Sequence, residues 1–270
     1  MDYKMIVLDL DGTLTNREKK ITPRTKETLM EAQKRGKIVV LASGRPVQGI
    51  LPLAEELKMK QYGGYILAFN GGMIINCRTG ETVSPVLLPQ NMNHTIVKLA
   101  EEHGVNILTY EGDTIITRKK DDQYVELEAG INQMKVREMG DMADYVTGIT
   151  VPKFLMVDDG DYLATVEPLV KAALGRDFSV YRSEPFFLEI LPKGIDKAQR
   201  LEVLLQILGI PREEMIACGD GYNDLTMIKY AGLGVAMENG VLPVRKAADY
   251  ITASNNEDGV ALVVEKFLLS

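Results

Sequence analysis

The chain has few of the residues and segments that mark secreted, membrane or nucleic-acid-binding proteins. Its only cysteines, Cys77 and Cys218, lie far apart, which argues against a disulfide framework. No apolar run approaches the roughly 20 residues that a membrane-spanning helix needs, and the N-terminal residues show no signal-peptide pattern. The net charge of −7 argues against a general nucleic-acid binder. We therefore expect a cytoplasmic globular protein that binds neither membranes nor nucleic acid.

Histidine is scarce as well, and biased segments are absent. Both histidines, His94 and His103, fall on one predicted helix, where we interpret them as surface or packing residues. The chain has no internal repeat and no low-complexity tract. Hydrophobic residues make up 46% and charged residues 26%, as in ordinary globular proteins with a sizeable core. A length of 270 residues allows two domains or one large one.

The first part of the chain alternates strand and helix patterns. Apolar runs at 5–8, 37–42 and 65–69 predict buried strands, and their continuous apolar character favours a parallel sheet covered on both faces. A helix is predicted at 21–36, with Thr22 as N-cap. A second helix follows Pro46. This order predicts the opening of a doubly wound α/β domain.

The pattern changes near residue 82 and returns after residue 189. The intervening segment mixes helices with short hairpin strands, at 93–104, 106–110, 114–117, 153–157, 165–174, 180–182 and 186–191. A helix at 196–208 and a strand at 215–218 then resume the alternation. We therefore predict an α/β fold in two domains. Residues 1–81 and 190–270 form a doubly wound, mostly parallel sheet, and residues 82–189 form an inserted α+β domain.

Two acids leave the end of the first predicted strand. Ligands bind outside the carboxyl ends of strands in open α/β sheets. Asp9 and Asp11 stand there, and Gly12 lets the chain turn sharply. Two adjacent carboxylates repel each other unless a cation or a proton intervenes. Mg²⁺ takes oxygen ligands of this kind beside a substrate's phosphate oxygens, although two acids at this spacing also occur in ordinary solvated turns.

The next two strand ends carry polar or flexible residues. Ser43 and Gly44 follow the second strand with a hydroxyl and backbone amides at a helix N-terminus. This arrangement suits either an anion site or a plain N-cap turn. Asn70, Gly71 and Gly72 follow the third strand, and we interpret them as a hairpin turn.

The segment after the strand at 215–218 reads GDGYND. Asp220 is suited to be a metal ligand on the loop, and Asp224 a supporting carboxylate in the first turn of a helix. Acids in that position also simply favour the helix. Lys197 opens the helix after the insertion, where it can pair with a transferring phosphate. It is otherwise one solvated lysine among many, and Lys193 is a rival for the same role.

These segments resemble, in order, the four motifs of the haloacid dehalogenase superfamily, whose members are mostly phosphotransferases with an aspartyl nucleophile. The likeness is to the Cof subfamily, and especially to YidA-type sugar phosphatases, in the strings DLDGT, SGRP, FNGG, FLEILP, GDGYNDLTMI, GVAM and SNNEDGVA. It covers essentially the whole chain, and the position of the insertion resembles a C2-type cap. One departure is Ala198 after Lys197, where many relatives have glycine, and it leaves the local helix packing open.

The resemblance implies a Mg²⁺-dependent phosphatase that hydrolyses small phosphate monoesters, with sugar phosphates as the expected substrates. It implies that Asp9 attacks phosphorus and forms an aspartyl phosphate. It implies that Asp11 protonates the leaving alcohol and then activates water. The other implied roles are Mg²⁺ binding by Asp9, the Asp11 carbonyl and Asp220, support by Asp224, and phosphate contacts by Leu10, Ser43, Gly44, Lys197 and Asn223.

Other classes of protein fit parts of the pattern. A receiver-type signalling module also uses an aspartate, Mg²⁺ and a lysine on a doubly wound sheet, but it needs no long insertion over the site. A phosphomutase of similar architecture carries comparable motifs. An inactive phospho-ligand-binding protein fits less well, because no motif acid is missing. The motifs leave the substrate itself open.

Overall fold

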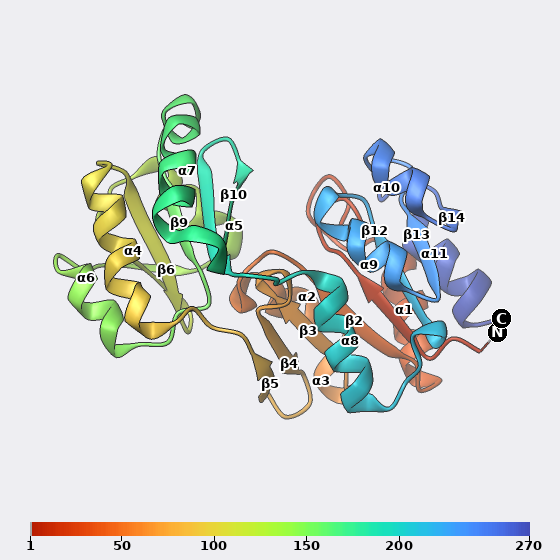
Figure 1. Ribbon diagram of the computed structural model, residues 1–270. Coiled ribbons are helices and arrows are strands. Elements are labelled where there is room, and N and C mark those ends of the chain that lie inside the picture. The colour runs from red at the N-terminus through yellow and green to blue at the C-terminus, as the bar shows by residue number, and fades with distance from the viewer. Residues whose placement is uncertain (1) are drawn as a thin grey trace. The chain divides into compact units, whose positions relative to one another are not determined.

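The computed structural model describes residues 2–270, which divide into two compact units (Figure 1). The core unit comprises the residues up to Ser84 together with Asp196–Ser270, and the inserted unit comprises Pro85–Ile195. The predicted boundaries at 82 and 189 fall inside strands β5 (Thr82–Pro85) and β11 (Phe187–Pro192). Because β11 is bonded on both sides to strands of the inserted unit, the whole strand stays in that unit.

The core unit is built on an eight-stranded sheet with the order β14-β13-β12-β1-β2-β3-β4-β5. From β14 to β3 every neighbouring pair runs parallel, and β4 turns back antiparallel to β3. This sheet confirms the predicted doubly wound, mostly parallel α/β fold. Its strands besides β5 are β1 (Met5–Leu8), β2 (Ile38–Ala42), β3 (Tyr65–Ala68), β4 (Met73–Asn76), β12 (Met215–Gly219), β13 (Leu233–Ala236) and β14 (Tyr250–Ile251).

Helices cover both faces of this sheet, which is why every residue of β1 is buried. On one face, Leu201 and Leu204 of α8 pack with Val7 and Val40 of the sheet. Elsewhere α1 packs against β2 and α11. The helix α1 starts as predicted, with the Thr22 side chain accepting from the Thr25 amide. The core helices are α1 (Pro23–Lys34), α2 (Val47–Glu56), α3 (Met59–Tyr62), α8 (Lys197–Leu208), α9 (Leu225–Tyr230), α10 (Leu242–Ala247) and α11 (Gly259–Val263).

The inserted unit contains a six-stranded sheet with the order β10-β11-β9-β6-β7-β8. All neighbouring pairs run antiparallel except β7 and β8. Helices α4, α6 and α7 contribute to one apolar core with the sheet. Its elements besides β11 are α4 (Gln90–Glu102), β6 (Asn106–Glu111), β7 (Thr114–Thr117), α5 (Gln123–Asn132), β8 (Lys135–Glu138), α6 (Met142–Tyr145), β9 (Phe154–Val157), α7 (Gly160–Leu174) and β10 (Phe178–Glu184).

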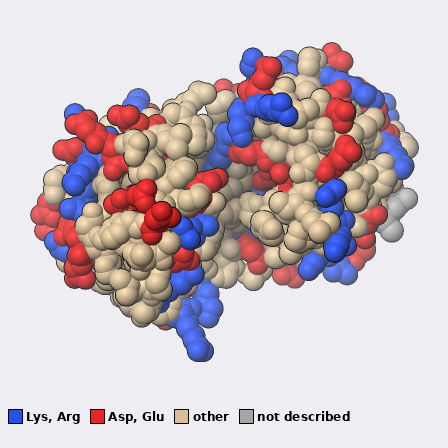
Figure 2. Space-filling model, turned by 90° about the horizontal axis from the view of Figure 1, so that it is seen from above, with Lys and Arg blue, Asp and Glu red and all other residues tan. Residues whose placement is uncertain are grey.

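The lengths of the helices and the distribution of surface charge bear on the kind of partner that the protein binds. Among residues 2–270, no helix combines the length and the apolar character needed to cross a bilayer. Figure 2 shows basic and acidic side chains interspersed over the face in view. On that face no continuous basic surface of the kind that attracts a phosphate backbone is present.

Candidate functional site

A buried charge cluster lies at the carboxyl end of β1. Asp9 follows the last residue of β1 and is only 6% exposed. Its side chain accepts a hydrogen bond from Lys197, with Nζ 2.6 Å from Oδ1. The same ammonium donates to Asp224 Oδ1, also at 2.6 Å, and the Lys197 side chain is completely buried. Folding thus joins three residues that are far apart in the sequence.

Lys197 and Asp224 are both held by the helices and loops that carry them. Lys197 is the first residue of α8, which Asp196 caps by accepting from the Gln199 amide. Asp224 Oδ2 accepts from the backbone amides of Asp220 and Gly221, at 2.9 and 2.8 Å. One Asp224 oxygen therefore binds the loop after β12, and the other binds the Lys197 ammonium. Asp224 thus holds the loop and the lysine in place.

The charges in this cluster determine its protonation. Burial alone would lower the pKa of Lys197, but Asp224 and Asp9 raise that pKa above its ordinary value. Burial raises the pKa of Asp9 to about 8, and the charge of Asp224 adds to the effect while Lys197 opposes it. Burial also raises the pKa of Asp220 to about 6, against a hydrogen bond from the Thr13 hydroxyl at 2.7 Å. When Asp9, Asp220 and Asp224 are all ionised, the single charge of Lys197 balances only part of their negative charge.

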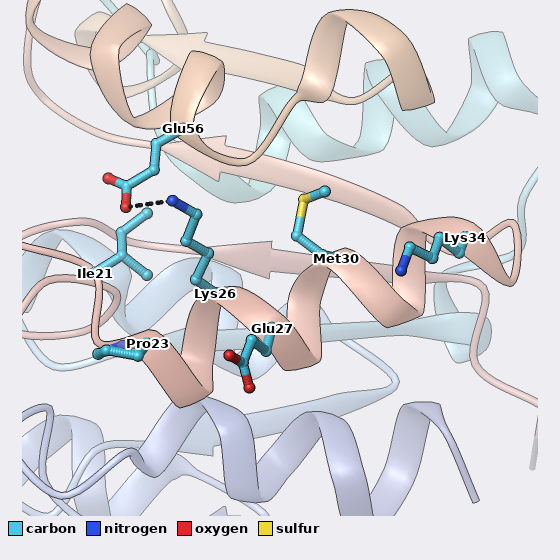
Figure 3. Close-up of a pocket in the computed structure, with 7 residues that line it drawn as sticks. All are labelled: Ile21, Pro23, Lys26, Glu27, Met30, Lys34 and Glu56. Atoms are coloured by element: carbon cyan, nitrogen blue, oxygen red, sulfur yellow. Dashed lines mark hydrogen bonds and ion pairs between the residues drawn. The ribbon is translucent and has the colours of Figure 1, made fainter.

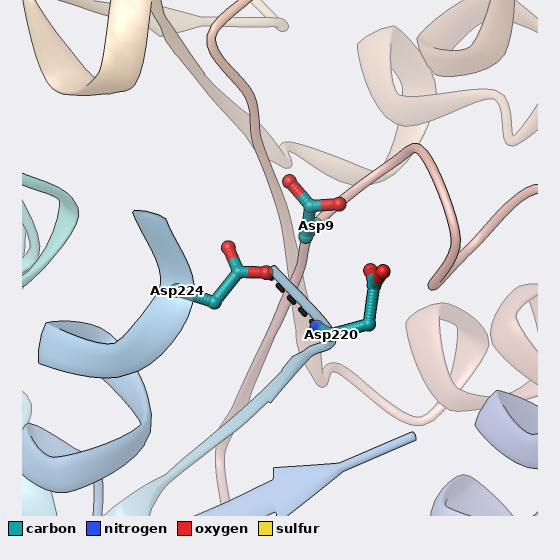
Figure 4. A group of neighbouring side chains, drawn as sticks. All are labelled: Asp9, Asp220 and Asp224. Carbon is teal, nitrogen blue, oxygen red and sulfur yellow. Dashed lines mark hydrogen bonds between the residues drawn. The ribbon is translucent and has the colours of Figure 1, made fainter. Parts of the chain in front are cut away.

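The acidic group fits a hard divalent cation. Asp9, Asp220 and Asp224 each place a carboxylate oxygen within 4.8 Å of the others (Figure 4). Such an oxygen donor set is the kind that Mg²⁺ takes. A cation would offset the burial, and the smaller repulsion from Asp224, that raise the pKa values of Asp9 and Asp220. Gly12 makes room for this approach, because a Cβ at that position would lie 2.3 Å from Asp220 Oδ2.

Asp11 is held by two basic side chains outside this acidic group. Arg45 donates to both of its oxygens, from Nε at 2.8 Å and from Nη2 at 2.6 Å, and Lys19 Nζ lies 2.7 Å from Oδ1. Burial would raise the pKa of Asp11, but these hydrogen bonds hold that pKa below its ordinary value. Sequence reasoning singled out neither Arg45 nor Lys19, and the only available signal was the arginine of SGRP.

Ser43 and Gly44 lie at the end of β2, next to β1. The Ser43 hydroxyl accepts from the Arg45 amide at 3.2 Å and is not the cap of a helix, because α2 begins at Val47 after Pro46. Of the two interpretations of Ser43, a plain helix N-cap is therefore wrong. Leu10 lies between the two acids of the first motif and is fully buried.

The turn after β3 reaches the same edge of the sheet. Asn70 accepts from Asn223 Nδ2 at 3.3 Å, and its amide lies against Gly44, where a Cβ would be 3.3 Å from Asn70 Nδ2. The predicted turn at residues 70–72 is present, but its contacts with two predicted phosphate-binding residues were missed. An asparagine at a strand end was the only local signal.

Lys193 and Cys218 were also singled out from the sequence. Lys193 belongs to the inserted unit, is exposed, and its backbone amide donates to the Asp177 carbonyl at 3.2 Å. Its rival Lys197 belongs to the core unit and contacts Asp9 there. Cys218 is fully buried on β12, as predicted.

A pocket of the core unit lies along α1 and contains no predicted site residue. An ion pair between Lys26 and Glu56, 3.2 Å long, is drawn in it (Figure 3). The residues that line the pocket are Ile21, Pro23, Lys26, Glu27, Met30, Lys34 and Glu56. The cluster around Asp9 therefore remains the candidate site.

Comparisons with known proteins agree over nearly the whole chain. Residues 6–264 match the family of haloacid dehalogenase-like hydrolases. A haloacid dehalogenase-like hydrolase from Bacteroides thetaiotaomicron is 50% identical, superposes with a TM-score of 0.95, and is matched over 98% of this chain and 99% of that one. Bacillus subtilis YxeH, whose name includes the word phosphatase, is 32% identical over 99% of each chain. The 5-amino-6-(5-phospho-D-ribitylamino)uracil phosphatase YcsE of Bacillus subtilis is 30% identical over 100% of this chain and 97% of that one.

Proposed function

This chain belongs to the haloacid dehalogenase-like hydrolase family and is a phosphatase, and we propose that it hydrolyses small phosphate monoesters with Mg²⁺ through an aspartyl phosphate on Asp9. Sugar phosphates are the proposed substrates. The observation that carries the proposal is the buried contact of Asp9 with Lys197 beside two further acids. The relatives support it, since one is named for a phosphorylated ribityl compound.

We propose that Asp9, Asp220 and the backbone carbonyl of Asp11 hold the metal ion, with Asp224 in support. The raised pKa values of Asp9 and Asp220 are consistent with this assignment, because burial and the neighbouring Asp224 carboxylate disfavour their ionised forms and a bound cation would favour those forms. A divalent cation bound there supplies charge neutralisation between the nucleophile and the phosphate.

In the first step, Asp9 attacks phosphorus, and the bond from phosphorus to the leaving oxygen breaks. Lys197 fixes the nucleophilic carboxylate and brings a permanent positive charge to the transferring group. The Ser43 hydroxyl and the backbone amides of Leu10 and Gly44, with the Asn223 side chain, are proposed to hold the phosphoryl oxygens. Water then cleaves the aspartyl phosphate and releases inorganic phosphate.

Asp11 is proposed to move the protons of both steps. It first gives a proton to the leaving alcohol and then accepts one from the attacking water. Arg45 occupies both Asp11 oxygens in the structure. Asp11 must therefore exchange part of that contact for the leaving oxygen before it donates a proton.

The decisive experiment is stereochemical. Each in-line displacement at phosphorus inverts its configuration, so two displacements through Asp9 give net retention in a chirally labelled phosphate monoester. Direct attack of water gives inversion, and that result from the unmodified protein would contradict the covalent route. Asp9→Asn should abolish turnover, whereas Asp11→Asn should still capture phosphate slowly from a substrate with a good leaving group.

Two simpler measurements separate the alternatives. Steady release of phosphate, lost with a chelator and restored by Mg²⁺, would exclude a receiver-type module. Product analysis with a hexose phosphate would identify a phosphomutase, because it yields an isomeric hexose phosphate instead of free phosphate.

A further inference from the structure

Two neighbouring residues after β3 have a left-handed backbone conformation that residues other than glycine rarely adopt. Phe69 and Asn70 have φ angles of 54° and 55°. The left-handed region is accessible to asparagine and unfavourable for a bulky aromatic residue. Strain of this kind persists only where the surroundings enforce it, and it concentrates at functional sites.

The surroundings of this turn do enforce it. The amides of Phe69 and Asn70 donate to the carbonyls of Arg45 and Ser43, at 3.0 and 2.8 Å, which ties the turn to the end of β2. Arg200 packs on Gly71, where a Cβ would lie 2.4 Å from its Cγ, and its Nε donates to the Gly71 carbonyl at 2.8 Å.

Arg200 also links the turn to the helix that carries Lys197. It lies three residues later on α8 and is only 8% exposed. A second guanidinium nitrogen, Nη2, donates to the backbone oxygen and the hydroxyl of Ser84, at 2.6 and 2.8 Å. The guanidinium is thus bound on two sides, so the turn and Lys197 have a fixed spacing.

The strained turn determines the position of the Asn70 side-chain amide. Asn70 Oδ1 accepts from Asn223, and a Cβ at Gly44 would lie 3.3 Å from Asn70 Nδ2 and 3.4 Å from Asn70 Oδ1. The side-chain amide of Asn70 thus lies next to both Gly44 and the Asn223 side chain, two of the groups that are proposed to hold the phosphate.

We propose that Asn70 is a further substrate-binding residue, whose side-chain N–H donates to a phosphoryl oxygen of the monoester, and that Arg200 is its positioning residue. The inference rests on the proposed function, since it takes the groups around Gly44 and Asn223 as the phosphate site. The turn between β3 and β4 then contributes to ligand binding besides reversing the chain.

The test is a substitution that keeps the backbone and removes the amide. Glycine adopts the left-handed conformation without strain, so Asn70→Gly should keep or raise the melting temperature while lowering kcat/KM about 10- to 100-fold, the range for a lost hydrogen bond to a charged group. Asn70→Asp keeps the shape but sets a negative charge against phosphate, and it should lower kcat/KM further. Lys58→Gly is the matched control, because Lys58 is exposed at a φ of 52° outside the site. It should leave kcat/KM unchanged.

Inorganic phosphate provides a readout that needs no turnover. Its dissociation constant with the Mg²⁺-loaded protein, measured by calorimetry, should rise in Asn70→Gly and Asn70→Asp but not in Lys58→Gly. Arg200→Lys should also weaken phosphate binding, and its effect should be smaller in the Asn70→Gly background, because the amide that it positions is already gone.

The outcomes separate the two proposals. If the unmodified protein binds phosphate but hydrolyses no monoester, the proposed function fails while the binding comparison still decides the role of Asn70. If both Asn70 variants bind phosphate as the unmodified protein does, the role of Asn70 is refuted even where turnover is intact. If the unmodified protein neither binds phosphate nor hydrolyses a monoester, both proposals fail.

Discussion

We expect the affinity for Mg²⁺ to depend steeply on pH, because the metal and a proton compete for the same carboxylates. The pKa of Asp9 is raised to about 8 and that of Asp220 to about 6, chiefly by burial. Metal binding requires the ionised forms and therefore releases the protons.

The two pKa values set the size of the effect. About half of Asp9 is ionised at pH 8 and about one per cent at pH 6, where Asp220 is about half ionised. The apparent affinity should therefore fall about 100-fold from pH 8 to pH 6, and about 50-fold more from pH 6 to pH 5, because both protons then compete. The slope against pH thus steepens from about one proton to about two.

Calorimetric titration of chelator-treated protein with Mg²⁺ across this range measures the slope directly. Asp220→Asn should remove the steeper part below pH 6. Asp11→Asn is the matched control, because it keeps the backbone carbonyl and removes only a side chain that pairs with Arg45 and Lys19. An affinity that stays constant between pH 6 and pH 8 would refute the reasoning, since Asp9 would then already be ionised beside Lys197.

The same shift predicts the stability of the metal-free protein. Asp9 has a folded-state pKa above its ordinary value of 3.8, so the folded state holds this proton more tightly than the unfolded state. Its contribution to the free energy of unfolding is therefore present at low pH and is lost as the pH rises from 3.8 towards about 8. Saturating Mg²⁺ should restore stability mainly at the upper end, as denaturant unfolding can show.

Three further predictions concern single side chains. Lys197→Ala should raise the catalytic barrier by about 2–4 kcal/mol, as for a lost oxyanion donor. Lys193→Ala should leave kcat nearly unchanged. Equal losses of kcat in the two variants would refute the assignment of Lys197 as the catalytic lysine. Arg45→Gln should lower kcat about 10-fold or more through loss of orientation at the acid–base carboxylate, and an unchanged kcat would contradict this. Lys153→Met should destabilise the inserted unit by about 3–5 kcal/mol, because it leaves Glu189 buried without its partner. Denaturant unfolding checks that value, and adding Glu189→Leu should recover most of it.

The parallel sheet could be predicted because its strands are covered on both faces. Each such strand reads as a continuous apolar run, as at β1 and β2. The segment 118–145 reads as a polar, charge-dense stretch without elements, yet it contains α5, β8 and α6. In α5, Leu127 and Ile131 share one helix face but are exposed, while Glu128 is buried, so the apolar pattern does not indicate the face that packs. Tertiary contacts override the local pattern there.

Asp9 and Asp220 could be singled out because each directly follows a strand, β1 or β12. The partners of Asp11 could not, since the Arg45 contact spans 34 residues and depends on β1 and β2 being neighbours. The Asn70 contact with Asn223 spans 153 residues and joins the turn after β3 to the loop after β12. Strand order creates such contacts, and no local pattern encodes them.

Asp9 and Asp11 have pKa values that are shifted in opposite directions, although both lie in the same turn. Asp9 lies buried with Lys197 and Asp224, and its pKa is raised, whereas Asp11 is held by Arg45 and its pKa is lowered. A nucleophile must be ionised and a general acid protonated, so both shifts oppose the proposed roles. A cation beside Asp9 lowers its pKa, and a phosphate that competes for Arg45 raises that of Asp11. We therefore infer that Asp9 and Asp11 are both in the wrong protonation state for catalysis when no ligand is bound. The metal ion and the substrate together bring them to the protonation states that catalysis requires.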